Sequence, residues 1–201
     1  MSVRSALVVL APLVLGGCVA SAVGADEAPN ATFLLNTVEA VDDLSPASGV
    51  QLLVPEPTAA EVFVSPRVVV RTSAREVQYL GNARLGDRLT RLTQIKLKRA
   101  LESGRGIGAV GLPGEGLAID YQVLTDIRAF EIVAGPPARA QLALTIRILD
   151  DRSGNVIAGR VFRAGAPLSA GELTNEAYIA ALDVALDTAL VEIRAWVVRQ
   201  V

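Results

Sequence analysis

Two long segments in which apolar and polar residues alternate constrain the fold of this chain more than any other feature. The first covers residues 117–127, and the second covers residues 142–148, where leucine and isoleucine occupy every second position. A period of two sends successive side chains to opposite faces of a β-sheet, so each segment predicts a strand with one buried and one wetter face. Gly135-Pro136-Pro137 joins the two strands. A third strand, residues 156–164, is predicted after the turn-forming residues Asp150–Asn155.

A first helix is predicted ahead of these strands. Its apolar face recurs at helical spacing, in Leu85, Leu89, Leu92, Leu97 and Ala100. Asn82 is a suitable N-cap for this helix, and Gly104 and Gly106 are suitable residues to end it. The glycines 104, 106 and 108 resemble a phosphate-binding loop, but they follow a helix rather than a strand, so we interpret them as a helix stop.

The last helix has the clearest pattern in the chain. Its apolar stripe runs from Tyr178 to Val197 and includes Trp196, which we expect to pack in the core. The sequence offers two candidates for its N-cap: a capping box formed by Ser169 and Glu172, or Thr174.

Shorter strands complete the prediction. They are expected at residues 32–36, 50–54, 67–71, 76–80 and 107–110. The order of elements predicts an α+β fold, in which a largely antiparallel sheet carries two main helices packed on one face in a single domain.

The N-terminus has the pattern of a bacterial lipoprotein signal. Arg4 is followed by an apolar stretch, and Leu15-Gly16-Gly17 precedes Cys18, the only cysteine of the chain. The stretch is shorter than the roughly 20 residues of a membrane-spanning helix. We therefore expect cleavage before Cys18, which would carry an N-acyl diacylglyceryl lipid, with palmitate among the acyl groups. The alternative is an ordinary secretory signal with a chance cysteine. Residue 19 is Val rather than Asp, which favours delivery to the outer membrane.

These expectations divide the chain into three parts. Residues 1–17 are a signal peptide, residues 18–31 are the lipidated cysteine and a flexible tether of small and polar residues, and residues 32–201 are one domain. Cleavage of the signal peptide would remove Arg4, so the net charge of the remaining chain would be one unit more negative than the −2 of the whole chain. This balance does not favour nucleic-acid binding.

The absence of histidine excludes several classes of active site. Without histidine, and with one cysteine reserved for the anchor, the chain has no Ser-His-Asp triad, no Cys-His pair and no ordinary zinc site. It also lacks a phosphate-binding P-loop. Asp120 and Asp126 do not suit a hydrolase that uses paired carboxylates, because six residues along a strand separate them by about 20 Å. We therefore predict no enzyme activity, no metal and no cofactor beyond the lipid on Cys18.

Five basic residues are predicted to share one side of the first helix: Arg84, Arg88, Arg91, Lys98 and Arg99. Such a stripe suits lipid phosphates or an acidic partner. The alternative interpretation is an ordinary solvated helix face.

Several segments together resemble a known family. They are Phe33-Leu34-Leu35, Arg67–Arg71, Val77–Leu89, Asp120–Phe130 and Leu149–Gly154. With the N-terminal signal and the final helix, they resemble the ABC-type transport auxiliary lipoproteins, the PqiC-like components of Mce-type lipid transport systems. The resemblance covers roughly residues 32–200. Many members have a tryptophan where this chain has Leu85, at the predicted start of the first helix.

The resemblance implies a function. It suggests an accessory subunit on the periplasmic face of the outer membrane, which docks to a tunnel of Mce-domain proteins without catalysis. An inner-membrane permease and an ATPase would belong to the same system, phospholipids or other hydrophobic molecules would be the cargo, and several copies would form a homo-oligomeric ring. The alternative is an envelope assembly or integrity lipoprotein that binds other outer-membrane proteins and has no role in lipid flux.

Overall fold

The computed structural model describes residues 31–36, 49–103, 105–168 and 173–201. They form an α+β domain, as predicted, in which a mixed sheet of nine strands is combined with three helices. The predicted signal peptide, Cys18 and nearly all of the predicted tether lie outside the described residues, as does the capping box of Ser169 and Glu172.

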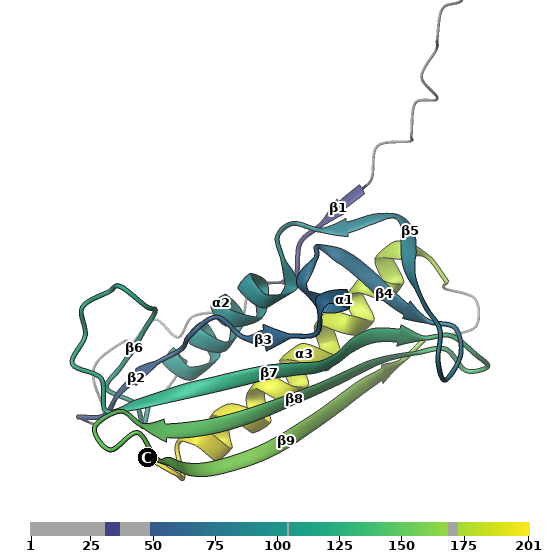
Figure 1. Ribbon diagram of the computed structural model, residues 1–201. Helices are drawn as coiled ribbons and strands as arrows, with labels where there is room; N and C mark the ends of the chain where they lie inside the picture. The colour runs from purple at the N-terminus through teal and green to yellow at the C-terminus, as the bar shows by residue number, and fades with distance from the viewer. Residues whose placement is uncertain (1–30, 37–48, 104, 169–172) are drawn as a thin grey trace, which may run out of the picture.

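Three long antiparallel strands form one side of the sheet, with the last of them at its edge (Figure 1). They are β7 (Tyr121–Val133), β8 (Arg139–Asp150) and β9 (Val156–Pro167). The predicted strands exist, but β7 begins four residues later than predicted and runs six residues further. A bulge between Ile127 and Ala129 breaks the simple alternation there, and this break hid the second half of β7 from a period-two pattern.

Short strands lie along the free edge of β7. Three strands pair with it in parallel: β2 (Gln51–Leu53), β3 (Thr58–Ala59) and β4 (Arg67–Arg71). They follow one another along β7 in the same order as in the sequence. The short helix α1 (Glu61–Val64) connects β3 to β4. Neither β3 nor α1 was predicted, because elements of two and four residues are too short to show a period.

The remaining strands extend the sheet at its two ends. The strand β5 (Val77–Leu85) is antiparallel to β4, β1 (Ala31–Phe33) is parallel to β5, and β6 (Ala109–Gly111) is parallel to β2. The long pairings of the sheet are thus antiparallel and the short ones are mostly parallel.

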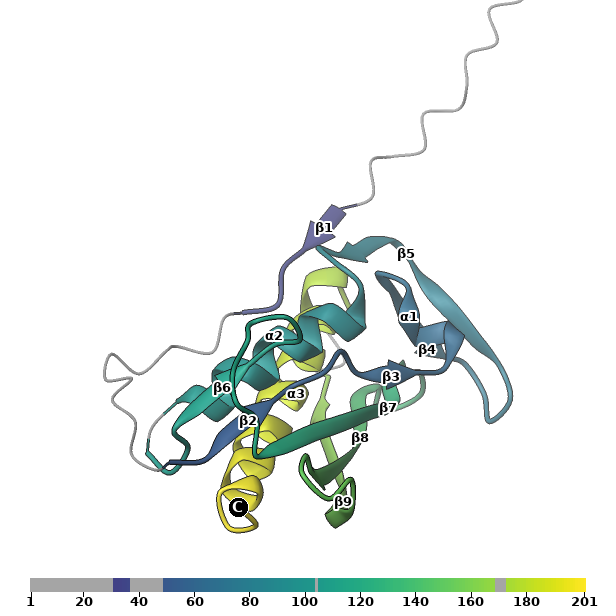
Figure 2. The same ribbon diagram turned by 60° about the vertical axis from the view of Figure 1, so that its left-hand side comes forward.

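Two helices pack on the same side of this sheet (Figure 2). The helix α3 (Asn175–Val197) lies along β8 and β9, and α2 (Leu89–Glu102) lies beside α3. Trp196 is 8% exposed and meets the ring of Phe162 edge-on, with 5.6 Å between the ring centroids. This contact confirms the prediction that Trp196 packs in the core. Thr174 is the N-cap of α3, and its side chain accepts a hydrogen bond from the backbone N–H of Ala177.

The predicted start of the first helix is wrong. The helix α2 begins at Leu89, and Asn82 lies within β5 with a φ of 54°. Asparagine tolerates this left-handed conformation better than most residues, which is the same property that makes it common in turns and caps. Leu85 is the last residue of β5 and is 2% exposed. The leucine in the family's tryptophan position is therefore a core residue of a strand, and it does not open the helix.

Candidate functional site

The five predicted basic residues belong to two different elements. Arg91, Lys98 and Arg99 lie on α2, and Arg88 is its N-cap residue. Arg84 lies on β5, where its Nε donates a hydrogen bond to Thr32 Oγ1 at 3.0 Å. The placement of Arg84 on the helix was therefore wrong, because the helix begins five residues later than this residue. We call the remaining four residues the α2 stripe.

The α2 stripe occupies the outward side of its helix. Leu92 and Ile95 are half-buried on the same side, between the basic residues, whereas Leu97 and Leu101 on the opposite side are fully buried. The outward side of α2 therefore combines positive charge with exposed apolar surface. This combination suits contact with a partner better than a purely charged helix face would.

Neighbouring side chains engage most of the α2 stripe. Arg88 forms an ion pair with Glu56 at 3.3 Å, Arg91 donates to Gln94 Oε1 at 2.6 Å, and Lys98 pairs with Glu102 one turn further along the helix. Arg99 is exposed, and within the described parts of the chain its guanidinium has no carboxylate in ion-pair distance. Three of the four residues of the α2 stripe thus have partners within the chain.

A hollow adjoins the N-terminal half of the α2 stripe. It has a volume of about 390 Å³ and is lined by Glu56, Arg91, Gln94, Leu112, Pro113 and Glu115. Glu56 is fixed there by Thr90, whose hydroxyl donates at 2.6 Å, and Glu115 accepts from the backbone N–H of Leu112 at 2.8 Å. Both carboxylates therefore serve to hold the walls of the hollow.

A buried lysine fixes the orientation of α2, and sequence reasoning missed it. Lys96 is 4% exposed, and its Nζ lies 2.5 Å from Asp183 Oδ1 and 2.7 Å from Asp187 Oδ1, both on α3. The backbone N–H of Asn36 also donates to Asp183, at 2.8 Å. The signal was present in the sequence, because Lys96 falls on the apolar side of its helix and Asp183 interrupts the apolar stripe of α3.

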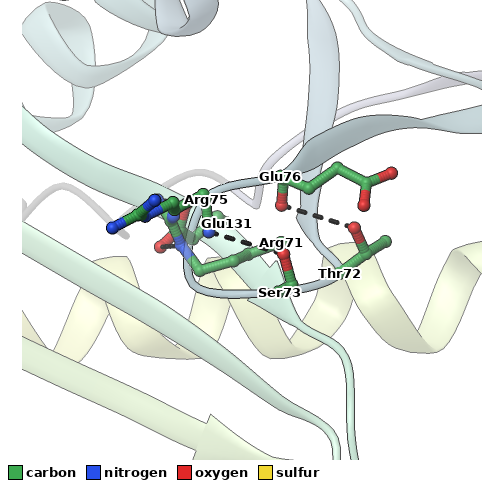
Figure 3. A network of polar contacts seen from close by, with 6 residues as sticks. All are labelled: Arg71, Thr72, Ser73, Arg75, Glu76 and Glu131. Carbon is green, nitrogen blue, oxygen red and sulfur yellow. Dashed lines mark hydrogen bonds and ion pairs between the residues drawn. The ribbon is translucent and has the colours of Figure 1, made fainter.

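A second ion pair, between a half-buried arginine and a buried glutamate, joins β4 to β7 (Figure 3). Arg71 donates two hydrogen bonds of 2.8 Å to Glu131, whose side chain is 1% exposed. The side-chain hydrogen bonds to Glu131 raise the pKa of the Arg71 guanidinium above its ordinary value. This pair also went unpredicted, since the sequence does not show that β4 and β7 are neighbours.

The carboxylates considered for catalysis have other tasks. Asp120 accepts a hydrogen bond from the backbone N–H of Gln51 at 2.8 Å, and Asp126 pairs with Arg128 at 3.3 Å. Across the described residues, no group of three or more acidic, histidine or cysteine side chains is arranged to hold a metal ion. Within those same residues, no helix has both the length and the apolar character needed to cross a membrane.

Comparisons with known proteins give a consistent result. Protein bll6063 of Bradyrhizobium diazoefficiens is 27% identical over 176 residues, which are 87% of this chain and 47% of that protein. The chain thus spans about half the length of this relative.

Solved structures show the same fold. Protein XCC0632 from Xanthomonas campestris has a TM-score of 0.75 and 26% identity, covering 85% of this chain and 95% of that one. The hypothetical protein CT253 from Chlamydia trachomatis has a TM-score of 0.50 and 13% identity, covering 76% and 98% of the two chains. A family model of ABC-type transport auxiliary lipoprotein components matches residues 33–194. The chain therefore belongs to the family of ABC-type transport auxiliary lipoprotein components.

Proposed function

We propose that this protein is an outer-membrane-anchored periplasmic subunit of an Mce/ABC-type lipid transport system, and that it acts by docking to the transporter. The observation that carries the proposal is the family match, which spans almost the whole folded domain. The structure adds a surface suited to docking, because the α2 stripe presents positive charge around the half-buried Leu92 and Ile95.

The anchor of this proposal is Cys18 with its N-acyl diacylglyceryl lipid. Thirteen residues lead from Cys18 to the first strand residue, Ala31, and a fully extended chain of that length spans at most about 45 Å. Anchoring keeps the domain within this distance of the membrane. It thereby raises the local concentration for docking to a second component that reaches the same membrane.

The partners of this proposal are a tunnel of Mce-domain proteins, an inner-membrane permease and its ATPase. We further propose that copies of this chain form a ring around the end of the tunnel. The native mass of the detergent-solubilised lipoprotein tests the ring, and a strictly monomeric mass both with and without the tunnel protein would contradict it.

Co-purification from native membranes tests the docking. The full-length lipoprotein is captured in mild detergent, and the bound proteins and lipids are identified by mass spectrometry. We expect an Mce-domain protein together with a permease and an ATPase. Recovery of only outer-membrane assembly or cell-wall proteins would refute the proposal and would favour an envelope-integrity role.

Three variants give this experiment its controls. Cys18→Ser should lose the outer-membrane fraction in cell fractionation. Arg91→Glu combined with Arg99→Glu should keep the anchor and lose the transporter subunits, because it cancels the positive charge of the α2 stripe. Arg147→Glu reverses an exposed charge on β8, away from the α2 stripe, and should retain them.

A further inference from the structure

The face of β8 and β9 away from α3 carries a hollow that no step of the proposed docking uses. Alternate residues of β8, among them Leu142 and Leu144, face the helices and are 1% exposed. The residues between them therefore point to the opposite face of the sheet. The hollow lies there, with a volume of about 380 Å³.

Two small residues, Ala143 and Gly165, are among those that line this hollow. Gln141 is paired with Gly165, and Ala143 is paired with Arg163 across the two strands. A Cβ atom at Gly165 would lie 2.9 Å from the backbone oxygen of Ala140, so this position needs glycine. The missing side chain leaves the floor open between Arg139 and Arg163, which line the hollow at its two ends.

The two arginines make the hollow strongly positive. Both are exposed, and across the described residues neither lies within ion-pair distance of a carboxylate. The nearest acidic residue in the same cross-strand row is Glu131, which is paired with Gln141 in the register. Glu131 is buried and already holds Arg71 through two hydrogen bonds, so it does not neutralise the hollow.

We propose that this hollow is a binding site for a phosphate group, held between the guanidinium groups of Arg139 and Arg163. Four residues along β8 separate the two ends of the site, which is about 13 Å of strand. Long side chains reaching inward from both ends can meet over Gln141 and Gly165. Guanidinium forks fit phosphate oxygens in pairs of hydrogen bonds, and an anion between two arginines also removes their mutual repulsion.

The site differs from the α2 stripe in its free charge. Three of the four stripe residues have partners within the chain, whereas Arg139 and Arg163 line an open hollow and pair with no carboxylate of the described residues. The phosphate belongs either to a phospholipid headgroup or to a free phosphate ion. The proposal does not depend on docking to a transporter, because the hollow and the α2 stripe lie on different elements.

The test is a titration of the full-length lipoprotein in a non-ionic detergent, followed by isothermal calorimetry and phosphorus NMR. The probes are inorganic phosphate, dihexanoyl phosphatidylglycerol and dihexanoylglycerol, which lacks the phosphate. The main variant is Arg139→Gln combined with Arg163→Gln. The matched control is Arg147→Gln, which removes an exposed arginine from the same face of β8 but outside the hollow.

We expect saturable binding of a phosphate-bearing probe to the wild-type protein, weakened about tenfold to a hundredfold in the double variant and unchanged in Arg147→Gln. Arg163→Lys keeps the charge and loses the fork, so it should weaken binding without altering the fold. Equal affinity for phosphate and the phospholipid identifies free phosphate as the ligand. Tighter binding of the phospholipid, with no effect of the variants on dihexanoylglycerol, identifies a lipid headgroup.

Two results would overturn the proposal. One is the absence of saturable binding of either phosphate-bearing probe to the wild-type protein. The other is a loss of affinity in Arg147→Gln equal to that in the double variant, since this would show general charge attraction instead of a site. The fluorescence of Trp196, the only tryptophan of the chain, checks that each variant is folded.

Discussion

Lys96 Nζ lies 2.5 Å from Asp183 Oδ1, in a buried ion pair that joins α2 to α3. Asp183 also accepts the backbone N–H of Asn36, so one carboxylate ties together both helices and the segment that follows β1. The pair sets the rotation of α2 about its axis. It thereby keeps Lys96 inside and turns the α2 stripe toward the outside.

Replacement of Lys96 by methionine should destabilise the domain strongly. The variant leaves the carboxylate of Asp183 buried and without its cation, and such a loss typically costs about 3–5 kcal/mol. Lys98→Met is the matched control, because Lys98 is the only other lysine of the chain and pairs with Glu102 on the helix surface. It should cost only about 0.3–0.5 kcal/mol. Urea unfolding measures both, and equal losses in the two variants would contradict the role assigned to Lys96.

Glu131→Gln should weaken the junction of β4 and β7. Glutamine keeps one acceptor for Arg71 and loses the charge and the second hydrogen bond, which should cost about 1–3 kcal/mol at this buried position. Asp126→Asn is the control, since Asp126 pairs with Arg128 at the surface and should contribute less than about 1 kcal/mol. Unfolding midpoints compare the two variants. A Glu131→Gln protein as stable as the wild type would show that the ion pair adds nothing.

Phe162→Ala should loosen the packing of α3 on β9. Phe162 is 1% exposed and contacts Trp196 edge-on, so its truncation leaves a cavity and should cost about 3–5 kcal/mol. The near-UV circular dichroism of Trp196 should weaken at the same time, because the indole loses its fixed neighbour. Val191→Ala, at a position on α3 that is 70% exposed, should change neither the stability nor the spectrum. An unchanged spectrum in Phe162→Ala would argue against this packing.

Asp150 should titrate at a lower pH than an ordinary aspartate. The backbone N–H of Ser153, at 2.7 Å, and then its hydroxyl hold the carboxylate in the turn after β8 and lower its pKa. The ordinary pKa is about 3.9, so the stabilisation is fully present above that pH. It is lost as the pH falls through the lower pKa of the folded state. NMR titration of the Asp150 carboxyl group measures its pKa directly. A pKa at or above the ordinary value would contradict the hydrogen-bonded turn.

The sequence predicted the parts of the fold that repeat a simple period. The alternation at residues 142–148 located β8, and the stripe from Tyr178 to Val197 located α3, whose cap at Thr174 was one of two candidates. These elements are long, and each buries a single face, so local pattern and tertiary packing agree.

The sequence failed where tertiary contacts override local pattern. Leu85 and Leu89 have helical spacing, yet Leu85 ends β5 and Leu89 begins α2. The prediction that Arg84 lies on the first helix was wrong for the same reason, because the helix begins only at Leu89. The two ion pairs join elements that lie far apart in the chain, and a single sequence does not show which elements meet. The hollow between Arg139 and Arg163 depends on the register of β8 with β9, which the strand pattern also leaves open.

Site-specific photo-crosslinking in living cells tests the central claim most directly, namely that this lipoprotein docks to a transporter through the α2 stripe. A photoreactive residue is placed at position 99, and in a second protein at position 147, where an exposed arginine lies on the opposite face of the sheet. We expect a crosslink from position 99 to a subunit of the transport system, the Mce-domain tunnel protein first, and a much weaker one from position 147. Crosslinks to no transporter subunit, or equal yields from both positions, would contradict it.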